Sequence, residues 1–186
     1  MTMESITDEE FIAATRTWLE KAVIGLNLCP FAKAVHVKNR IRFAVSHAQS
    51  DDELVEALSN ELNALHDADP EMCETTLLIH PFVLNDFLDY NDFLDVADAT
   101  VEALGLTGEI QVASFHPHYQ FADSEPDDID NYTNRSPYPT LHLLRESSIE
   151  QALQAIPDAA DIYDNNITTL RRLGHEGWRR LWIDET

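Results

Sequence analysis

Short apolar segments alternate with amphipathic helical segments along most of this chain of 186 residues. Apolar side chains at helical spacing indicate three helices in the first part of the chain, and short apolar runs indicate a strand after each. The helices are expected at 8–24, 50–65 and 85–104, and the strands at 41–47, 75–81 and 109–117. This alternation predicts an α/β fold, with a small, mostly parallel sheet of about four strands flanked by helices.

The last third of the chain departs from this alternation. A fourth strand is expected at 140–145, and it follows the third through a loop instead of a helix. We therefore expect the fourth strand to lie antiparallel beside the third. Two helices follow, the first up to residue 156 and the second over 158–173, and Trp178 and Trp182 are expected to pin the tail to the body. Without a linker or a second apolar core, the sequence predicts a single domain over 1–186, with a C-terminal helical tail at 158–186.

The chain is strongly acidic, which excludes several classes of partner. It has 34 Asp and Glu residues against 12 Lys and Arg, and its net charge at pH 7 is −22. Nucleic acids and anionic membranes bind basic surfaces, so neither is an expected partner. The sequence has no apolar run of about 18 residues, as a membrane span would need, and its start lacks the features of a signal peptide. We expect a cytoplasmic protein.

The segment 115–146 is the expected functional region. It has no helical or strand periodicity through its middle, and it contains three of the eight histidines and four of the eight prolines. Loops of this length within a compact domain are uncommon, and most are functional or disordered. This one is too rich in aromatic residues to be disordered. We therefore place the candidate site here.

Histidines stand at the ends of the expected strands. In open α/β sheets ligands bind outside the carboxyl ends of the strands, and an antiparallel fourth strand would bring one more histidine to that rim. The four residues are His47, His80, His116 and His142. Imidazoles suit zinc, copper, iron and nickel, and Asp127, Asp128 or Glu146 could complete a metal site. The spacings match no compact metal motif, so no metal ligand is assigned.

Cys29 is the candidate nucleophile. It precedes Pro30, and proline is favoured at the first position of a helix, so Cys29 would be the N-cap of a short helix over 30–35. The helix dipole would then lower the pKa of its thiol. His116 is the most plausible base, and Asp128, Asn131 or Asn134 could orient it. The alternative is that Cys29 is a buried structural thiol.

Arg135 and Arg145 are conspicuous in so acidic a chain. A guanidinium group can hold a carboxylate or phosphate through paired hydrogen bonds, and Asn134, Ser136 and Tyr138 could add neutral ones. The alternative is that both arginines form internal salt bridges with acidic residues nearby. The chain contains neither a GxGxxG nor a Walker motif, so a nucleotide cofactor is not expected, and no other cofactor is assigned.

Several unusual strings in the sequence resemble a known family. They include GLNLCPFAK at 25–33, ASFHP at 113–117, NYTNRSPYP at 131–139 and LHLLRE at 141–146. Through them the chain resembles, over about residues 10–155, a mainly bacterial family that carries only a numbered domain-of-unknown-function label in the fourteen-hundreds. The residues that match its pattern are Cys29, His116, Arg135, His142 and Arg145, whereas His80 and His118 are not part of it. The resemblance therefore favours a Cys–His–Arg cluster over a four-histidine metal site, and it implies no activity, substrate or cofactor.

These observations lead to two functional hypotheses. The first is a small-molecule enzyme, a Cys/His-based hydrolase or transferase that acts on an anionic substrate. Its candidate catalytic residues are Cys29, His116 and His142, and its candidate substrate-binding residues are Asn131, Asn134, Arg135, Tyr138 and Arg145. The second is a non-catalytic binding or assembly module, or a histidine-ligated metal-binding protein.

Overall fold

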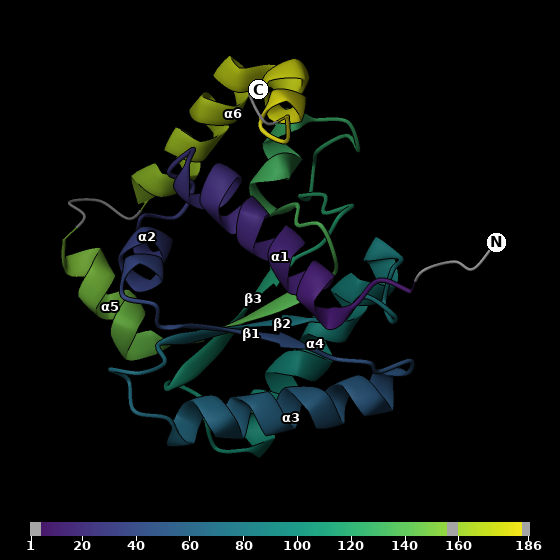
Figure 1. Ribbon diagram of the computed structural model, residues 1–186, viewed down its shortest axis with the longest axis vertical. Helices are drawn as coiled ribbons and strands as arrows, with labels where there is room; N and C mark the ends of the chain where they lie inside the picture. Colours follow the sequence, from purple (N-terminus) through teal and green to yellow (C-terminus); the bar gives the residue numbers. More distant parts are fainter. Residues whose placement is uncertain (1–4, 156–159, 184–186) are drawn as a thin grey trace.

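A four-stranded sheet with helices on both faces forms the body of the protein (Figure 1). The structure, a computed structural model, describes residues 5–155 and 160–183. The elements are, in order, α1 (Asp8–Trp18), the π-helix η1 (Leu19–Ile24), α2 (Pro30–Val37), β1 (Ile41–Val45), α3 (Asp51–Asp67), β2 (Thr75–Ile79), α4 (Phe87–Ala103), β3 (Ile110–Phe115), the 3₁₀ helix η2 (Ile129–Asn134), β4 (Thr140–Arg145), α5 (Glu146–Gln154) and α6 (Ala160–Arg180). Within the described residues, no helix is long and apolar enough to cross a membrane.

The sheet is mixed, so the prediction of a mostly parallel sheet is wrong. The strand order is β1-β2-β4-β3, with β1 parallel to β2 and β4 antiparallel to both of its neighbours. The predicted antiparallel pairing of the last two strands is therefore confirmed. However, β4 also inserts between β2 and β3 and so removes the parallel pairing expected there. All six residues of β4 are buried, as suits a central strand.

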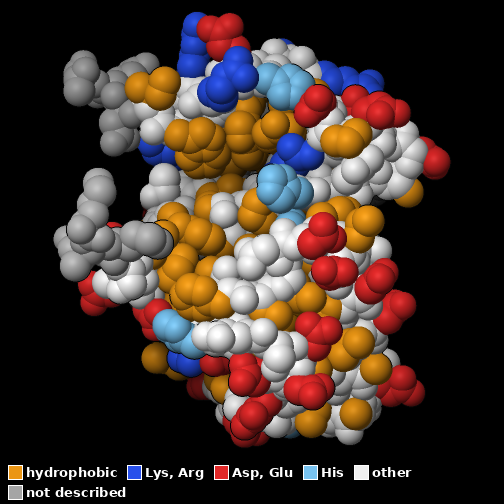
Figure 2. Space-filling view, turned by 90° about the vertical axis from the view of Figure 1, so that its right-hand side faces the viewer, with side chains coloured by type: hydrophobic (Ala, Val, Ile, Leu, Met, Phe, Trp, Pro, Cys, Tyr) orange, Lys and Arg blue, Asp and Glu red, His pale blue; other side chains and the backbone are white. Residues whose placement is uncertain are grey.

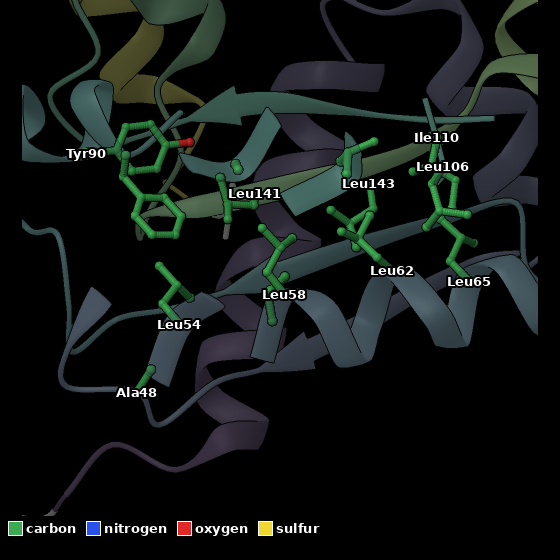
Figure 3. Close-up of a cluster of buried hydrophobic side chains, with 14 of the residues drawn as sticks. Ala48, Leu54, Leu58, Leu62, Leu65, Tyr90, Leu106, Ile110, Leu141 and Leu143 are labelled. Carbon is green, nitrogen blue, oxygen red and sulfur yellow. The ribbon is translucent and has the colours of Figure 1, made fainter. Parts of the chain in front are cut away.

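One face of the sheet packs against α3 and α4. Leucines recur along α3 at intervals of three or four residues, so they lie on one face of the helix. They pack against Leu141 and Leu143 of β4 and Tyr90 of α4 (Figure 3). The α3 residues are Leu54, Leu58, Leu62 and Leu65, each at most 1% exposed. Burying a leucine side chain contributes about 1.5–3 kcal/mol, so this face accounts for much of the folding free energy.

The other face of the sheet is covered by α1, η1, α2, α5 and α6 (Figure 1). Its core includes Trp18 and Phe115, whose rings meet edge to face at 5.1 Å between centroids. His142 lies on this face because successive residues of a strand point to opposite sides, and its neighbours Leu141 and Leu143 point to α3. His142 therefore points to the side of the sheet that α1 and α6 cover.

Local sequence explains where several helices begin and end. Thr7 and Glu10 form the predicted capping box of α1, and Cys29 is the N-cap of α2, as predicted from the following proline. Asn27 takes a positive φ of 54° in the turn that leads to Cys29. Gly174, with φ 67°, kinks α6, which continues beyond the predicted end at residue 173 to Arg180. The predicted helix boundary at 156–158 lies outside the described residues.

Candidate functional site

The loop between β3 and β4 is folded against α6. In η2, the Tyr132 ring meets Trp178 edge to face at 5.1 Å between centroids and His175 at 5.5 Å. The Asp130 carboxylate accepts a hydrogen bond of 2.7 Å from the Arg171 guanidinium. The long loop and the C-terminal helix therefore form a single packed unit beside α1.

A cavity of about 600 Å³ lies between α1, this loop and the second part of α6. Its aromatic walls and polar groups are Trp18, Tyr132, Trp178, Trp182, His118 and Arg135, and we call it the aromatic cavity. These three tryptophans are all the tryptophans that the chain has. Figure 2 shows hydrophobic side chains gathered at a hollow in the upper half of this face, with basic and histidine side chains beside them. Acidic side chains lie at the top and upper right of that face and over much of its lower half.

Arg135 is the cation of the aromatic cavity. Its Nε donates to the carbonyl of Tyr119 at 3.1 Å, and its Nη2 donates to the carbonyl of Pro126 at 2.6 Å. The guanidinium lies 4.4 Å from the centroid of the Tyr132 ring, within the range of a cation–π interaction. No acidic side chain among the described residues pairs with it. Arg135 is thus oriented by neutral groups, and the salt-bridge alternative does not apply to it.

The other polar residues of the loop hold the loop together. The Asn131 amide is buried: its Oδ1 accepts from the Phe121 N–H at 2.9 Å and from the Ser124 hydroxyl at 2.8 Å, and its Nδ2 donates to the Glu125 carbonyl at 2.7 Å. Asn134 Nδ2 donates to the Ser114 carbonyl at 2.9 Å. These contacts fix the position of Arg135 and account for the two asparagines structurally.

Tyr138 and Ser136 close the end of the loop that leads into β4. The Tyr138 ring packs edge to face on Phe11 of α1, with 4.7 Å between centroids. The Ser136 hydroxyl donates to the Tyr138 carbonyl at 2.6 Å. Ser136 lines the aromatic cavity, whereas Tyr138 faces α1 outside it.

His116 and His80 are buried near the ends of β3 and β2, and the ring of each lies against the ring of Tyr90. Because His116 Nδ1 accepts from the His118 N–H at 3.0 Å, its proton is on Nε2, which donates to the Leu84 carbonyl at 3.0 Å. Burial lowers the pKa of both histidines, that of His80 to about 4, so both are neutral at pH 7. Among the described residues, no group of three or more His, Cys, Asp or Glu side chains could hold a metal ion.

Cys29 and His142 line a separate cavity of about 210 Å³ on the same side of the sheet, which we call the thiol chamber. The His142 ring is hydrogen-bonded through Nε2 to the hydroxyl of Thr75. Burial raises the pKa of the Cys29 thiol, an effect only partly offset by the N–H groups of Ala32 and Phe31 in the first turn of α2. Burial also lowers the pKa of His142 to about 4. The helix dipole therefore does not make Cys29 an anion at neutral pH.

Arg145 lies at the opposite end of β4 from the loop. Its Nε donates to the Cys73 carbonyl at 3.1 Å, and its Nη2 donates to the carbonyls of Leu65 at 2.5 Å and Ala68 at 2.7 Å. It thus holds the C-terminus of α3, where carbonyl groups lack helical partners. It lines neither cavity and has no acidic partner within the described part of the chain.

The structure therefore separates the sequence-derived candidates into three places. Arg135 is in the aromatic cavity, Cys29 and His142 are in the thiol chamber, and His116 lies near the end of β3, bound to backbone groups on both nitrogens. The tryptophans of the aromatic cavity were not among the candidates. Trp178 of α6 and Trp182, in the turn after it, stand four residues apart in the sequence, a spacing that would place both on one face of a helix.

The comparisons with known proteins identify a family. Neither the search of curated proteins nor the search of solved structures found a match for this chain. A family model described as "Protein of unknown function (DUF1415)" matches residues 10–180. The match confirms the family resemblance seen in the sequence and extends beyond residue 155 into α6, so it includes both Arg135 and Trp178. The chain therefore belongs to the DUF1415 family.

Proposed function

We propose that the protein binds a small molecule that combines an aromatic ring with an anionic group, and that it does so in the aromatic cavity without catalysis. The observation that carries this proposal is the setting of Arg135. Its guanidinium is held at the cavity by two backbone carbonyls and the Tyr132 ring, with no carboxylate to neutralise it among the described residues. A ligand anion is the partner that such a group lacks.

The size and walls of the cavity support a ring-containing ligand. Its volume of about 600 Å³ is in the range of small-molecule pockets, which are concave and mostly apolar, with a few well-placed polar groups. Aromatic rings pair best edge to face or offset, and the tryptophans offer such surfaces to a planar ligand. Trp178 is 8% exposed and Trp182 39% exposed, so one forms the interior and the other the rim.

Charge supports a specific anion site here. The chain carries a net charge of −22, so an anion is repelled by most of the surface at long range. Selective binding of an anion therefore requires a fixed local cation, and Arg135 is one. The Nη1 group of Arg135 makes no hydrogen bond with any described residue and remains for the ligand.

The chemistry of the lining favours binding over catalysis. Among the described residues, no cysteine and no carboxylate lines the aromatic cavity, and the Ser136 hydroxyl already donates to a carbonyl. Thr17 and His118 also line the cavity, but no hydrogen bond joins their side chains among the described residues. A nucleophile paired with a base, as covalent catalysis requires, is therefore not assembled from these groups. This supports the non-catalytic alternative for this cavity.

Tryptophan fluorescence tests the proposal directly, because every tryptophan of the chain lines the cavity. We expect benzoate and phenyl phosphate to change the emission and to bind about tenfold or more tightly than neutral benzamide, as charge-assisted hydrogen bonds predict. The two anions distinguish a carboxylate site from a phosphate site. Equal affinities for benzoate and benzamide, or no response to any of the three at about 1 mM, would contradict the proposal.

Matched arginine variants assign the effect to one side chain. Arg135→Gln should abolish the preference for the anions while keeping the affinity for benzamide. Arg135→Lys keeps the charge but loses the planar fork, so an intermediate preference is expected. Arg171→Gln is the control, because it breaks the Arg171–Asp130 pair of the same loop outside the cavity. If the Arg171 variant loses the preference as fully as the Arg135 variant, loop packing and not Arg135 recognises the anion.

A further inference from the structure

The thiol chamber is a cavity that the proposed function does not use. It lies between the sheet and the helices α2, α5 and α6, and its floor is formed by Ala113 and Phe115 of β3 together with His142 and Leu144 of β4. Apart from Cys29 and the exposed Gln111 of β3, the other walls are apolar, with Leu28, Phe31, Ile149, Ala152, Leu153 and Ile162 among them. The Trp18–Phe115 contact separates it from the aromatic cavity, because Trp18 lines one cavity and Phe115 lines the other.

We propose that the thiol chamber is a second ligand-binding site, which takes a small, neutral, apolar molecule with a single hydroxyl or carbonyl group. Its apolar walls would hold the hydrocarbon part, and the imidazole of His142 and the thiol of Cys29 would meet the polar group. The site is distinct from the aromatic cavity in place, in charge and in the ligand it selects.

The volume of the chamber supports a small ligand. An engineered apolar cavity of about 150 Å³ admits benzene or xenon, and this chamber, of about 210 Å³, is of the same order. Cys29 is only partly buried, so the chamber is open to molecules from solution. A ring with one short substituent, or a short aliphatic chain, matches this space.

The polar groups of the chamber support a neutral ligand. Its lining contains no Lys, Arg, Asp or Glu. Burial keeps His142 uncharged, with a pKa of about 4, and raises the pKa of Cys29, so neither group offers a charge at neutral pH. An ion that entered would lose its hydration without an ionic partner, which costs several kcal/mol.

The Cys29 thiol and the His142 imidazole are held in place by contacts outside the chamber. The His142 ring is oriented by its hydrogen bond to the Thr75 hydroxyl. The turn that carries Cys29 is fixed because the buried Asn166 of α6 donates through Nδ2 to the Leu28 carbonyl at 2.8 Å. Thiol and imidazole are therefore presented to the chamber from two rigid elements, as a preformed site requires.

Protection of Cys29 from a small neutral thiol reagent tests the proposal. We would label the full chain with methyl methanethiosulfonate at about pH 8.5, where thiols are reactive, and follow each cysteine by mass spectrometry. Benzyl alcohol at ten times its dissociation constant should slow the labelling of Cys29 about tenfold by mass action. Cys73 lines no part of the chamber and is the internal control, so its rate should not change.

Benzoate distinguishes the two sites in a single experiment. It has the ring of benzyl alcohol but carries a charge, so it should leave Cys29 labelling unchanged even where it alters tryptophan emission. Protection of Cys29 by benzyl alcohol without any emission change on adding benzoate would support the chamber and contradict the aromatic cavity. An emission change with benzoate but no protection of Cys29 by benzyl alcohol would contradict the chamber alone.

Two helix variants provide a matched pair for the chamber itself. Ala152→Phe adds a ring to the chamber wall from α5 and should remove the protection by benzyl alcohol. Ala99→Phe makes the same change at an exposed position of α4 and should leave the protection intact. Undiminished protection in the Ala152 variant, or equal slowing of Cys29 and Cys73 in the wild type, would overturn the proposal.

The role of the imidazole has its own readout. In the wild type, benzyl alcohol should protect Cys29 better than toluene does, because only the alcohol can hydrogen-bond. His142→Leu should reverse this order, since the chamber then lacks the imidazole. An unchanged order in that variant would show that His142 does not bind the polar group, and would contradict the role given to its imidazole.

Discussion

The imidazole of His142 and the hydroxyl of Thr75 are hydrogen-bonded to each other on the α1 side of the sheet, between the neighbouring strands β4 and β2. Thr75 is opposite Leu144 and His142 is opposite Leu77, so the two polar side chains are diagonal neighbours on one face. This hydrogen bond orients His142, which is buried and has leucines on both sides of it in the sequence of β4.

Thr75→Val should destabilise the protein by about 1–3 kcal/mol, because it leaves a buried imidazole nitrogen without its partner. The next residue offers a matched control. The Thr76 hydroxyl is buried and has no hydrogen-bond partner among the described residues, so Thr76→Val should be neutral or stabilising. Denaturant unfolding of both variants measures the difference. Equal losses would mean that β-sheet packing, and not the hydrogen bond, determines the effect.

The stability of the protein should fall with acid in a window to which the buried His142 and His80, each with a pKa of about 4, both contribute. The pKa of the His142 imidazole is about 4 in the folded state and about 6.5 when unfolded, so the unfolded state binds more protons between these values. The stability that the neutral His142 contributes is therefore complete above about pH 6.5. It is lost as the pH falls toward 4, at up to about 1.4 kcal/mol per pH unit.

The variant His142→Leu isolates this effect of pH on stability. It removes the titrating group, so its free energy of unfolding should depend less on pH between about 4 and 6.5 than that of the wild type. Unfolding by urea at several pH values gives the two slopes. Parallel curves would show that His142 is protonated equally in both states.

The pH dependence of Cys29 alkylation tests the nucleophile hypothesis. Because burial raises the pKa of this thiol above its ordinary value of 9.0, its reaction with iodoacetamide should still be accelerating at that pH. A reactive catalytic cysteine has a depressed pKa and would reach its full rate below neutrality or near it. A rate that levels off near pH 7 would restore Cys29 as a candidate nucleophile and contradict the description of the chamber as uncharged.

Arg145→Lys should destabilise the protein by about 2 kcal/mol or more, because an ammonium group cannot reproduce the fork that reaches three carbonyls around the end of α3. Its affinity for benzoate should not change, since Arg145 lines neither cavity. Arg180→Lys is the matched control: its pair with Glu176 is exposed and should contribute less than about 1 kcal/mol. A loss of benzoate binding at unchanged stability would return Arg145 to the substrate-binding residues.

Elements with strong local patterns could be predicted from the sequence. The capping box at Thr7, the proline after Cys29 and the periodic leucines of α3 each act within a few residues, and the structure has the expected helices there. The position of β4 within the sheet could not be predicted in the same way. Its apolar run predicts a buried strand, but the choice of β2 as a second partner is made by packing across the whole sheet.

The candidate site was only partly predictable for the same physical reason. Arg145 was a candidate to hold a ligand anion, with an internal salt bridge as the alternative. Its partners are instead backbone carbonyls of residues 65, 68 and 73, and such acceptors have no side-chain signature in a sequence. Arg135 was recognised because a cation in a long loop of an acidic chain is unusual. Trp178 and Trp182 were expected only to pack the tail, and Trp18 was expected in the first helix, because their common cavity forms only when α1 and α6 meet.

The aromatic cavity joins Trp18 of α1 to Trp178 of α6, two residues from nearly opposite ends of the described chain. Contacts between such distant residues close a very large loop, and proteins rich in them fold slowly. The cavity should therefore be among the last parts of the molecule to form during refolding. Recovery of tryptophan emission would report this final docking of α6, and a ligand that bridges both helices would act mainly by slowing their separation in the unfolding reaction.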